Sequence, residues 1–358
     1  MPDLSHLLES HGEGFVLAWG GLLVGLLFGF FAQRSKFCLR AAVIEFWHGQ
    51  FGEKLPVWLL AFASAVVAVQ ALILMGWLDV KTARQMANTG SLSGALVGGV
   101  LFGVGMILTR GCASRLLVLS ATGNLRALLS GLIFAVAAQA SLGGALSPVR
   151  LSISGWWTID GGSARDLLIW TGAGHWGGLA FGGVWLLAGI YFAVRNRWRP
   201  LKWVVAICTG LTVALAWWFS YQVSQSSFEV INVQGLTFSG PSAEWLMRVL
   251  ASPAPPMGFD FGLMPGVFAG SFLGALMGKE WKLEGFKDGH SMRRYILGAT
   301  LMGFGAMLAG GCAVGAGITG GAIFAVTAWL SLLGMWLGAG LTDRLIDGRT
   351  ARPLVAIR

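Results

Sequence analysis

Long apolar windows separated by short polar segments make up most of this chain. All 25 Lys and Arg residues lie outside these windows or at their rims. Each window is long enough to cross the hydrocarbon core of a bilayer as a helix. The pattern predicts an all-α polytopic membrane protein, with one membrane domain over residues 1–358 and about nine transmembrane helices. The windows fall at residues 14–31, 56–78, 93–109, 127–148, 174–194, 202–221, 262–278, 295–311 and 320–341.

Two of these windows end in near copies of one motif. Residues 101–115 read LFGVGMILTRGCASR, and residues 301–315 read LMGFGAMLAGGCAVG. Each copy is an apolar helix, spaced with glycine, that runs directly into a Gly-Cys pair. Non-helical backbone inside a membrane is tolerated where it lines a cavity or is buried in protein. The motif therefore predicts broken or re-entrant helices with a thiol at each break, in a duplicated chain.

A second pair of windows carries glycine at every fourth position, which makes a flat helix face for close packing. Each glycine ladder leads into a basic turn. The shared order of ladder, basic turn and Gly-Cys helix supports a first repeat at 14–150 and a second repeat at 262–341. Spans over 174–221 and an outer loop at 222–261 would link them. The ladders are Gly21, Gly25 and Gly29, and Gly266, Gly270 and Gly274.

The distribution of positive charge predicts the topology. If the N-terminus is outside, 20 of the 25 Lys and Arg residues lie in cytoplasmic segments, as the positive-inside rule requires. The C-terminus is then cytoplasmic. The two Gly-Cys helices come out antiparallel, as in inverted repeats, whereas the two ladders come out parallel. No single symmetry relates both pairs, and re-entrant windows would account for the mismatch.

The net charge of +9 is explained by this topology, so we expect no nucleic-acid partner. The predicted outer loop contains a β-prone run at Phe228–Phe238 and a helical pattern at Ser242–Leu250. We expect it to be ordered and to cover an entrance, with a passive connector as the alternative. No carboxylate is predicted near the centre of a span, which favours facilitated passage over ion-coupled transport.

The four cysteines are the candidate reactive groups, and their spacing matches neither a CxxC redox motif nor a zinc site. No metal or cofactor is therefore predicted. Cys208 lies in the middle of a span and is interpreted as a small apolar filler. Cys38, Cys112 and Cys312 each follow a glycine-rich helix. Packing of a small residue is the alternative for these three as well.

The positive charge near the helix breaks and the chemical softness of the thiols together indicate the expected class of ligand. Helix N-termini that follow the breaks present partial positive charge, and nearby basic side chains add full charges, so an anion is favoured. Thiols favour a soft, polarizable ligand. Neutral thiols are expected, because a thiolate would repel an anion, and weak successive sites suit conduction. The candidate binding residues are Cys38, Cys112, Cys312, Gly111, Gly311, Arg34, Lys36, Arg110 and Arg115.

Three segments of this chain resemble the YeeE/YedE family, a sulphur-transport family that includes bacterial thiosulfate transporters. They read FGFFAQRSKFCLRAAV, LFGVGMILTRGCASR and MGFGAMLAGGCAVGAG, and the resemblance covers residues 20 to 340 approximately. It implies a permease that takes up thiosulfate across the bacterial inner membrane, in which the outside N-terminus expected from the charge count would be periplasmic. It also implies that Cys38, Cys112 and Cys312 pass the anion along by S–H···S hydrogen bonds. A cytoplasmic TusA-like sulfur-carrier protein is an implied partner.

Two alternatives to a thiosulfate permease remain open from the sequence. Other members of the family are linked to selenium, so the cargo could be another sulfur or selenium species. A membrane thiol-disulfide oxidoreductase is less favoured, because its two thiols would have to approach within bonding distance. The chain is accordingly predicted to be a transporter and not an enzyme.

Overall fold

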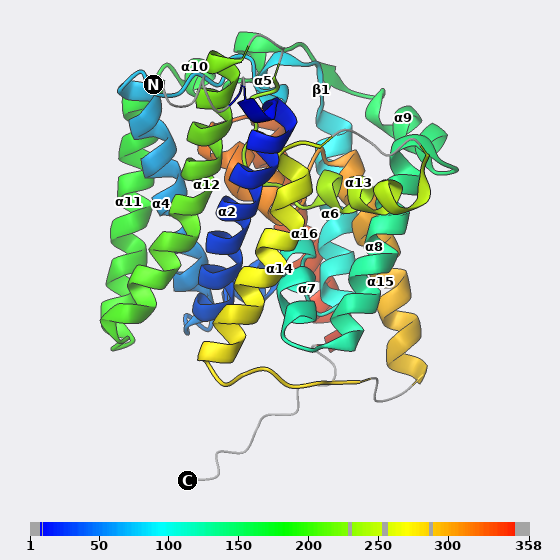
Figure 1. Cartoon of the computed structure of the whole chain (residues 1–358). Helices are drawn as coiled ribbons and strands as arrows, with labels where there is room; N and C mark the ends of the chain where they lie inside the picture. Colours follow the sequence, from blue (N-terminus) through cyan, green and yellow to red (C-terminus); the bar gives the residue numbers. More distant parts are fainter. Residues whose placement is uncertain (1–7, 9, 228–230, 253–256, 286–288, 348–358) are drawn as a thin grey trace.

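The computed structural model describes residues 8, 10–227, 231–252, 257–285 and 289–347 of the chain. In this part the regular structure is almost entirely helical (Figure 1). The long helices are α2 (Glu13–Ser35), α4 (Lys54–Leu74), α6 (Leu92–Leu108), α8 (Leu125–Gly143), α11 (Gly174–Arg195), α12 (Pro200–Ser226), α13 (Ser239–Leu250), α14 (Phe259–Met277), α15 (Gly289–Leu308) and α16 (Val326–Thr342). The short elements are α3 (Leu39–Trp47), α5 (Arg84–Ala87), β1 (Gly90–Ser91), α7 (Ala113–Ala121), α9 (Ser147–Ser154), β2 (Thr158–Ile159), η1 (Gly162–Arg165), α10 (Leu167–Thr171), η2 (Ala313–Gly320) and η3 (Asp343–Asp347).

Eight helical segments of the described chain are long and apolar enough to cross a membrane. Three of them join a long helix to a short one across a break: α2 with α3, α6 with α7, and α15 with η2. The 17-residue α16 packs along α6 and is also long enough to cross a membrane. With α16, the described chain reaches the predicted number of about nine transmembrane helices. The protein is therefore an all-α, multi-pass membrane protein with helices broken at the Gly-Cys motifs.

The two glycine ladders pack against each other, and α2 and α14 form the tightest helix pair of the bundle. A Cβ on Gly21 would lie 2.0 Å from the carbonyl oxygen of Phe259, and one on Gly25 would lie 2.4 Å from that of Leu263. Because the partner positions increase together along both helices, α2 and α14 are parallel. Close approach of the two backbones is possible only because both contact faces lack side chains.

The two Gly-Cys helices also pack through glycine, but in opposite directions. Gly98 of α6 approaches Ala309 just after the end of α15, and Gly105 approaches Gly298 in the middle of α15, so the helices are antiparallel. Helix α16 continues this packing on the other side of α6, where it runs parallel to it. These relative directions agree with those predicted from the charge count. Helices α4, α11 and α12 complete the bundle beside α2 (Figure 1).

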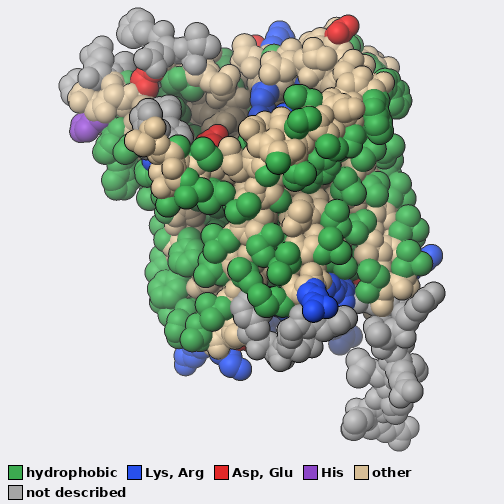
Figure 2. All heavy atoms as spheres, turned by 90° about the vertical axis from the view of Figure 1, so that its right-hand side faces the viewer, with side chains coloured by type: hydrophobic (Ala, Val, Ile, Leu, Met, Phe, Trp, Pro, Cys, Tyr) green, Lys and Arg blue, Asp and Glu red, His purple; other side chains and the backbone are tan. Residues whose placement is uncertain are grey.

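The bundle has two chemically different ends. We call the end at which α2 and α14 finish the basic face, and its cations are coloured blue at the lower end of Figure 2. The other end, which we call the opposite face, holds the β1–β2 ladder and the short helices α5, α9 and α10 (Figure 1). The basic face carries Arg34, Lys36, Arg195, Arg197, Arg199, Lys202, Lys279 and Lys282.

The predicted outer loop enters the protein interior. Residues 231–238 form no strand, although their composition favours one, and the first three residues of the β-prone run lie outside the described part. The segment instead runs in an extended form between helices, with Leu236 and Phe238 buried. Its backbone is satisfied by side chains, since Thr319 donates to the carbonyl of Leu236 at 2.6 Å. The predicted helical pattern that follows forms α13.

The α2–α14 contact predicts a strong effect of adding one methyl group. Gly25→Ala would place its Cβ on the backbone of Leu263, which cannot move aside as a side chain can. We expect the midpoint of thermal unfolding in detergent to fall by about 5 °C or more. Gly131→Ala in α8 is the matched control, because nothing lies within 4 Å of its Cβ. An equal midpoint for the two variants would contradict the packing described here.

Candidate functional site

The three helix breaks have the same backbone conformation. At each break a residue with positive φ ends the long helix, and a cysteine two positions later is the N-cap of the short helix. Positive φ is uncommon for residues other than glycine, so two of the three positions adopt a rare conformation. The pairs are Lys36 (φ 58°) with Cys38 before α3, Arg110 (φ 58°) with Cys112 before α7, and Gly310 (φ 77°) with Cys312 before η2.

One of the thiols caps the helix that it begins. The Cys312 sulfur accepts a hydrogen bond from the backbone N–H of Gly315 at 3.5 Å. The Cys112 sulfur makes no such bond to the backbone of α7 and lies 3.4 Å from the Ser114 hydroxyl. Both cysteines are 0 % exposed. Each thiol therefore faces a helix N-terminus inside the protein, where the free N–H groups favour negative charge.

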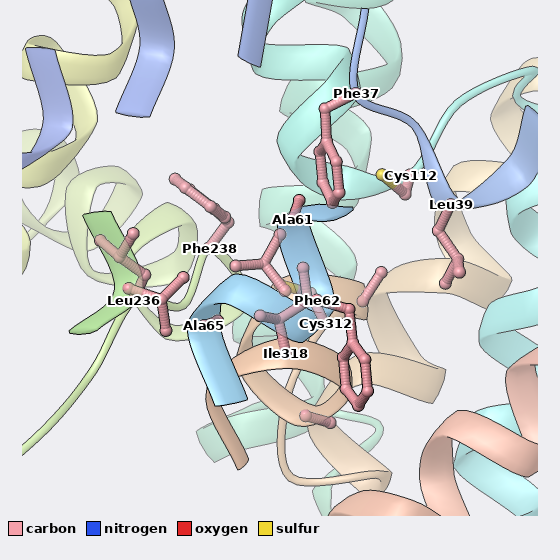
Figure 3. Close-up of a cluster of buried hydrophobic side chains, with 14 of the residues drawn as sticks. Phe37, Leu39, Ala61, Phe62, Ala65, Cys112, Leu236, Phe238, Cys312 and Ile318 are labelled. Atoms are coloured by element: carbon pink, nitrogen blue, oxygen red, sulfur yellow. The ribbon is translucent and has the colours of Figure 1, made fainter. Parts of the chain in front are cut away.

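The three breaks converge. The thiols of Cys38 and Cys312 are both close enough to the Cys112 thiol to act on it electrostatically. Figure 3 shows Cys112 and Cys312 in one buried cluster with Phe37 and Leu39, the two neighbours of Cys38. The short helices leave this region in opposite directions. Helix α7 leads to the basic face, whereas η2 leads to Ala325, which bridges to Asp166 on the opposite face.

Apolar side chains form the walls around the thiols. Phe62, Leu236, Phe238 and Ile318 belong to the same buried cluster as Cys112 and Cys312 (Figure 3). The extended segment 231–238 brings two of these residues, and its Thr237 lies against Gly315 at the start of η2. A site of this kind strips water from a ligand and strengthens the few polar contacts that remain. The β-prone composition of this run predicted an ordered segment of an outer loop, but its place beside the thiols was not predicted, because this place depends on contacts with distant helices.

The basic candidates fall into two groups. Arg34, Lys36 and Arg115 gather on the basic-face side of the thiols, where Arg34 and Arg115 both act electrostatically on Lys36. The side chain of Arg110 is exposed, and the backbone of this residue supplies the left-handed turn at its break. The predicted glycines Gly111 and Gly311 lie immediately before the buried cysteines.

Cys208 lies apart from the other three thiols. It lines an apolar recess between α2, α4 and α12 together with Leu27, Phe31 and Trp218. None of the described contacts joins Cys208 to the three helix breaks.

A polar cavity of about 420 Å³ opens on the opposite face. Glu244, Asp260 and Gln234 are among the residues that line it, and Figure 2 shows a hollow with charged side chains at this end. Burial raises the pKa of the Glu244 carboxyl, so its charge is more easily neutralised than that of an exposed glutamate. Gln234 also begins the stretch that leads to Thr237 and the Cys312 thiol. The backbone segment 231–238 therefore runs from the wall of this cavity to the start of η2, next to Cys312.

Comparisons with known proteins identify the family of this chain. The family model described as Sulphur transport matches residues 34–341. The Thiosulfate transporter TsuA of Escherichia coli (strain K12) is 26 % identical, over 94 % of this chain and 97 % of that protein. The Thiosulfate transporter TsuA of Spirochaeta thermophila is 25 % identical, over 92 % of this chain and 100 % of that protein. The predicted YeeE/YedE resemblance is confirmed, and the chain belongs to the Sulphur transport family.

Proposed function

We propose that this protein is a permease for thiosulfate, which it passes along the thiols of Cys38, Cys112 and Cys312. The observation that carries the proposal is the convergence of three helix N-termini, each begun by a cysteine, inside an apolar protein interior. The names of the two relatives and the family support the choice of thiosulfate. The protein would act as a transporter and not as an enzyme.

The geometry suggests how an anion would pass. It would enter the polar cavity on the opposite face and follow segment 231–238 to Cys312. There the neutral thiols would donate S–H hydrogen bonds to the terminal sulfur or to the oxygens, while the helix N-termini stabilise the negative charge. Thiols are weak donors, so each site would hold the anion only briefly, as conduction requires. The anion would then leave past Lys36 and Arg115 on the basic face.

The basic face would be cytoplasmic, because positive residues accumulate on the cytoplasmic side of membrane proteins. The N-terminus would then be periplasmic and the C-terminus cytoplasmic in a bacterial inner membrane. A sulfur-carrier protein of the TusA type would take up the cargo at the basic face. We further propose residues 14–150 and 262–341 as the two repeats of a single membrane domain.

The first experiment measures uptake of radiolabelled thiosulfate into proteoliposomes. Cys112→Ala and Cys312→Ala should each lower the uptake rate by about tenfold or more, since each removes a buried hydrogen bond to an anion. Cys208→Ala should transport like the wild type, because this residue lies outside the site. Equal rates for all three variants would rule out passage along the thiols. Unlabelled sulfite, sulfide and selenium anions, added as competitors, test the alternative cargoes.

The second experiment tests the geometry of the breaks. A Cβ on Gly311 would lie 2.8 Å from the backbone nitrogen of Ala316, whereas one on Gly111 would meet only the flexible side chain of Leu116 at 3.3 Å. We therefore expect Gly311→Ala to abolish uptake by displacing η2 from Cys312. Gly111→Ala should keep a large part of the activity. Uptake would be measured at matched protein content, after the reconstituted amount of each variant has been determined.

A further inference from the structure

A short segment after α14 crosses the basic face beneath the thiols. We call residues 278–284 the strap; it follows α14 and appears in yellow at the bottom of Figure 1. Its far end pairs with the α7–α8 turn, where Lys282 N–H donates to the carbonyl of Thr122 at 3.1 Å and Glu284 N–H to that of Gly123 at 2.9 Å. At its near end, Glu280 N–H donates to the carbonyl of Ala275 at 2.9 Å. The strap is thus held at both ends.

The strap carries one carboxylate into the cationic group next to the thiols. Glu280 forms an ion pair with Lys36 and accepts a hydrogen bond from Gln33 Nε2 at 2.8 Å. Gln33 in turn accepts a hydrogen bond from Arg115 at 3.3 Å. A Cβ on Gly278 would lie 2.6 Å from an Arg34 nitrogen and 3.2 Å from the Glu280 carboxyl carbon, so Arg34 borders the same point.

These cations lie next to the thiols along the chain. Lys36 is the left-handed residue two positions before Cys38, and Arg115 lies three positions after Cys112, in the first turn of α7. An anion that leaves the thiols toward the basic face therefore meets the site that Glu280 already occupies. The side chains of Lys36 and Glu280 are 36 % and 35 % exposed. An ion pair with this much water around it is weak and easily exchanged for another anion.

We propose that Glu280 is a tethered anion that occupies the basic-face anion site and is displaced by the small dianion that the protein carries. Glu280 pairs with Lys36, while Arg34 borders this pair and Arg115 is linked to it through Gln33. One carboxylate thus stands among three cations, so the resting site retains positive charge and still attracts anions. Exchange of one anion for another avoids leaving three like charges unpaired. The identity of the cargo rests on the proposed function, whereas the anion site itself does not.

The test measures the reaction of Cys38 with charged thiol reagents applied at the basic face. The probes are the anionic sulfonatoethyl methanethiosulfonate and its cationic trimethylammonium counterpart, in a Cys208→Ala background with Cys38→Ala as the blank. Glu280→Gln removes one negative charge, so the anionic reagent should modify Cys38 about tenfold faster than in the parent protein. The rate of modification by the cationic reagent should not rise. Glu53→Gln is the matched control, since it breaks another ion pair of this face, with Lys202 at 2.5 Å.

Each other outcome overturns the proposal. Equal acceleration of both reagents in Glu280→Gln would make the strap a steric cover and not a competing anion. Rates equal to those of Glu53→Gln would remove any role of Glu280 at this site. Glu280→Asp keeps the charge and is the control for a folding defect caused by substitution at this position. Its Cys38 should react at rates closer to those of the wild type than to those of Glu280→Gln. Because these probes do not depend on the cargo, a failure of thiosulfate uptake in the wild type would count against the proposed function alone.

Discussion

The architecture depends on how three interrupted helices satisfy their backbone groups away from water. A helix that stops inside a membrane leaves N–H and C=O groups that lipid cannot bond. Here each interruption restarts at a cysteine, and at Cys312 the sulfur bonds the new helix N-terminus. The same unpaired N–H groups that make such breaks costly also make the region attractive to an anion.

Close glycine packing makes this arrangement possible. Helices α2 and α14 approach backbone to backbone, and α6 is held in the same way between α15 and α16. In a membrane there is little hydrophobic force between helices, so dispersion contacts between smooth faces hold them together. The rigid frame then presents the breaks, and segment 231–238 fills the space beside Cys312. Phe238 of this segment packs on Phe28 of α2, with ring centroids 5.2 Å apart.

The two ends of the path differ in chemistry. On the opposite face, Glu244 and Asp260 share a polar cavity, and one carboxylate oxygen of Asp260 is buried with no hydrogen-bond partner among the described residues. On the basic face, Lys36 pairs with the carboxylate of Glu280, and Arg115 is linked to it through Gln33. Asp260 lies in the first turn of α14, at the rim of the predicted window. The two ends of the bundle thus differ in charge, with carboxylates in the cavity of the opposite face and an excess of cations on the basic face.

The sequence by itself determined the class of the protein, the positions of the helix breaks and the candidate thiols. Hydropathy and the repeated Gly-Cys motif are local patterns, which can be recognised in the sequence without knowledge of the fold. The tertiary structure decided which distant residues meet. Gln33 and Glu280 are 247 positions apart, and Thr319 reaches the carbonyl of Leu236 across 83 positions. Such contacts depend on helix directions and on where a segment is buried, which no spacing along the chain encodes.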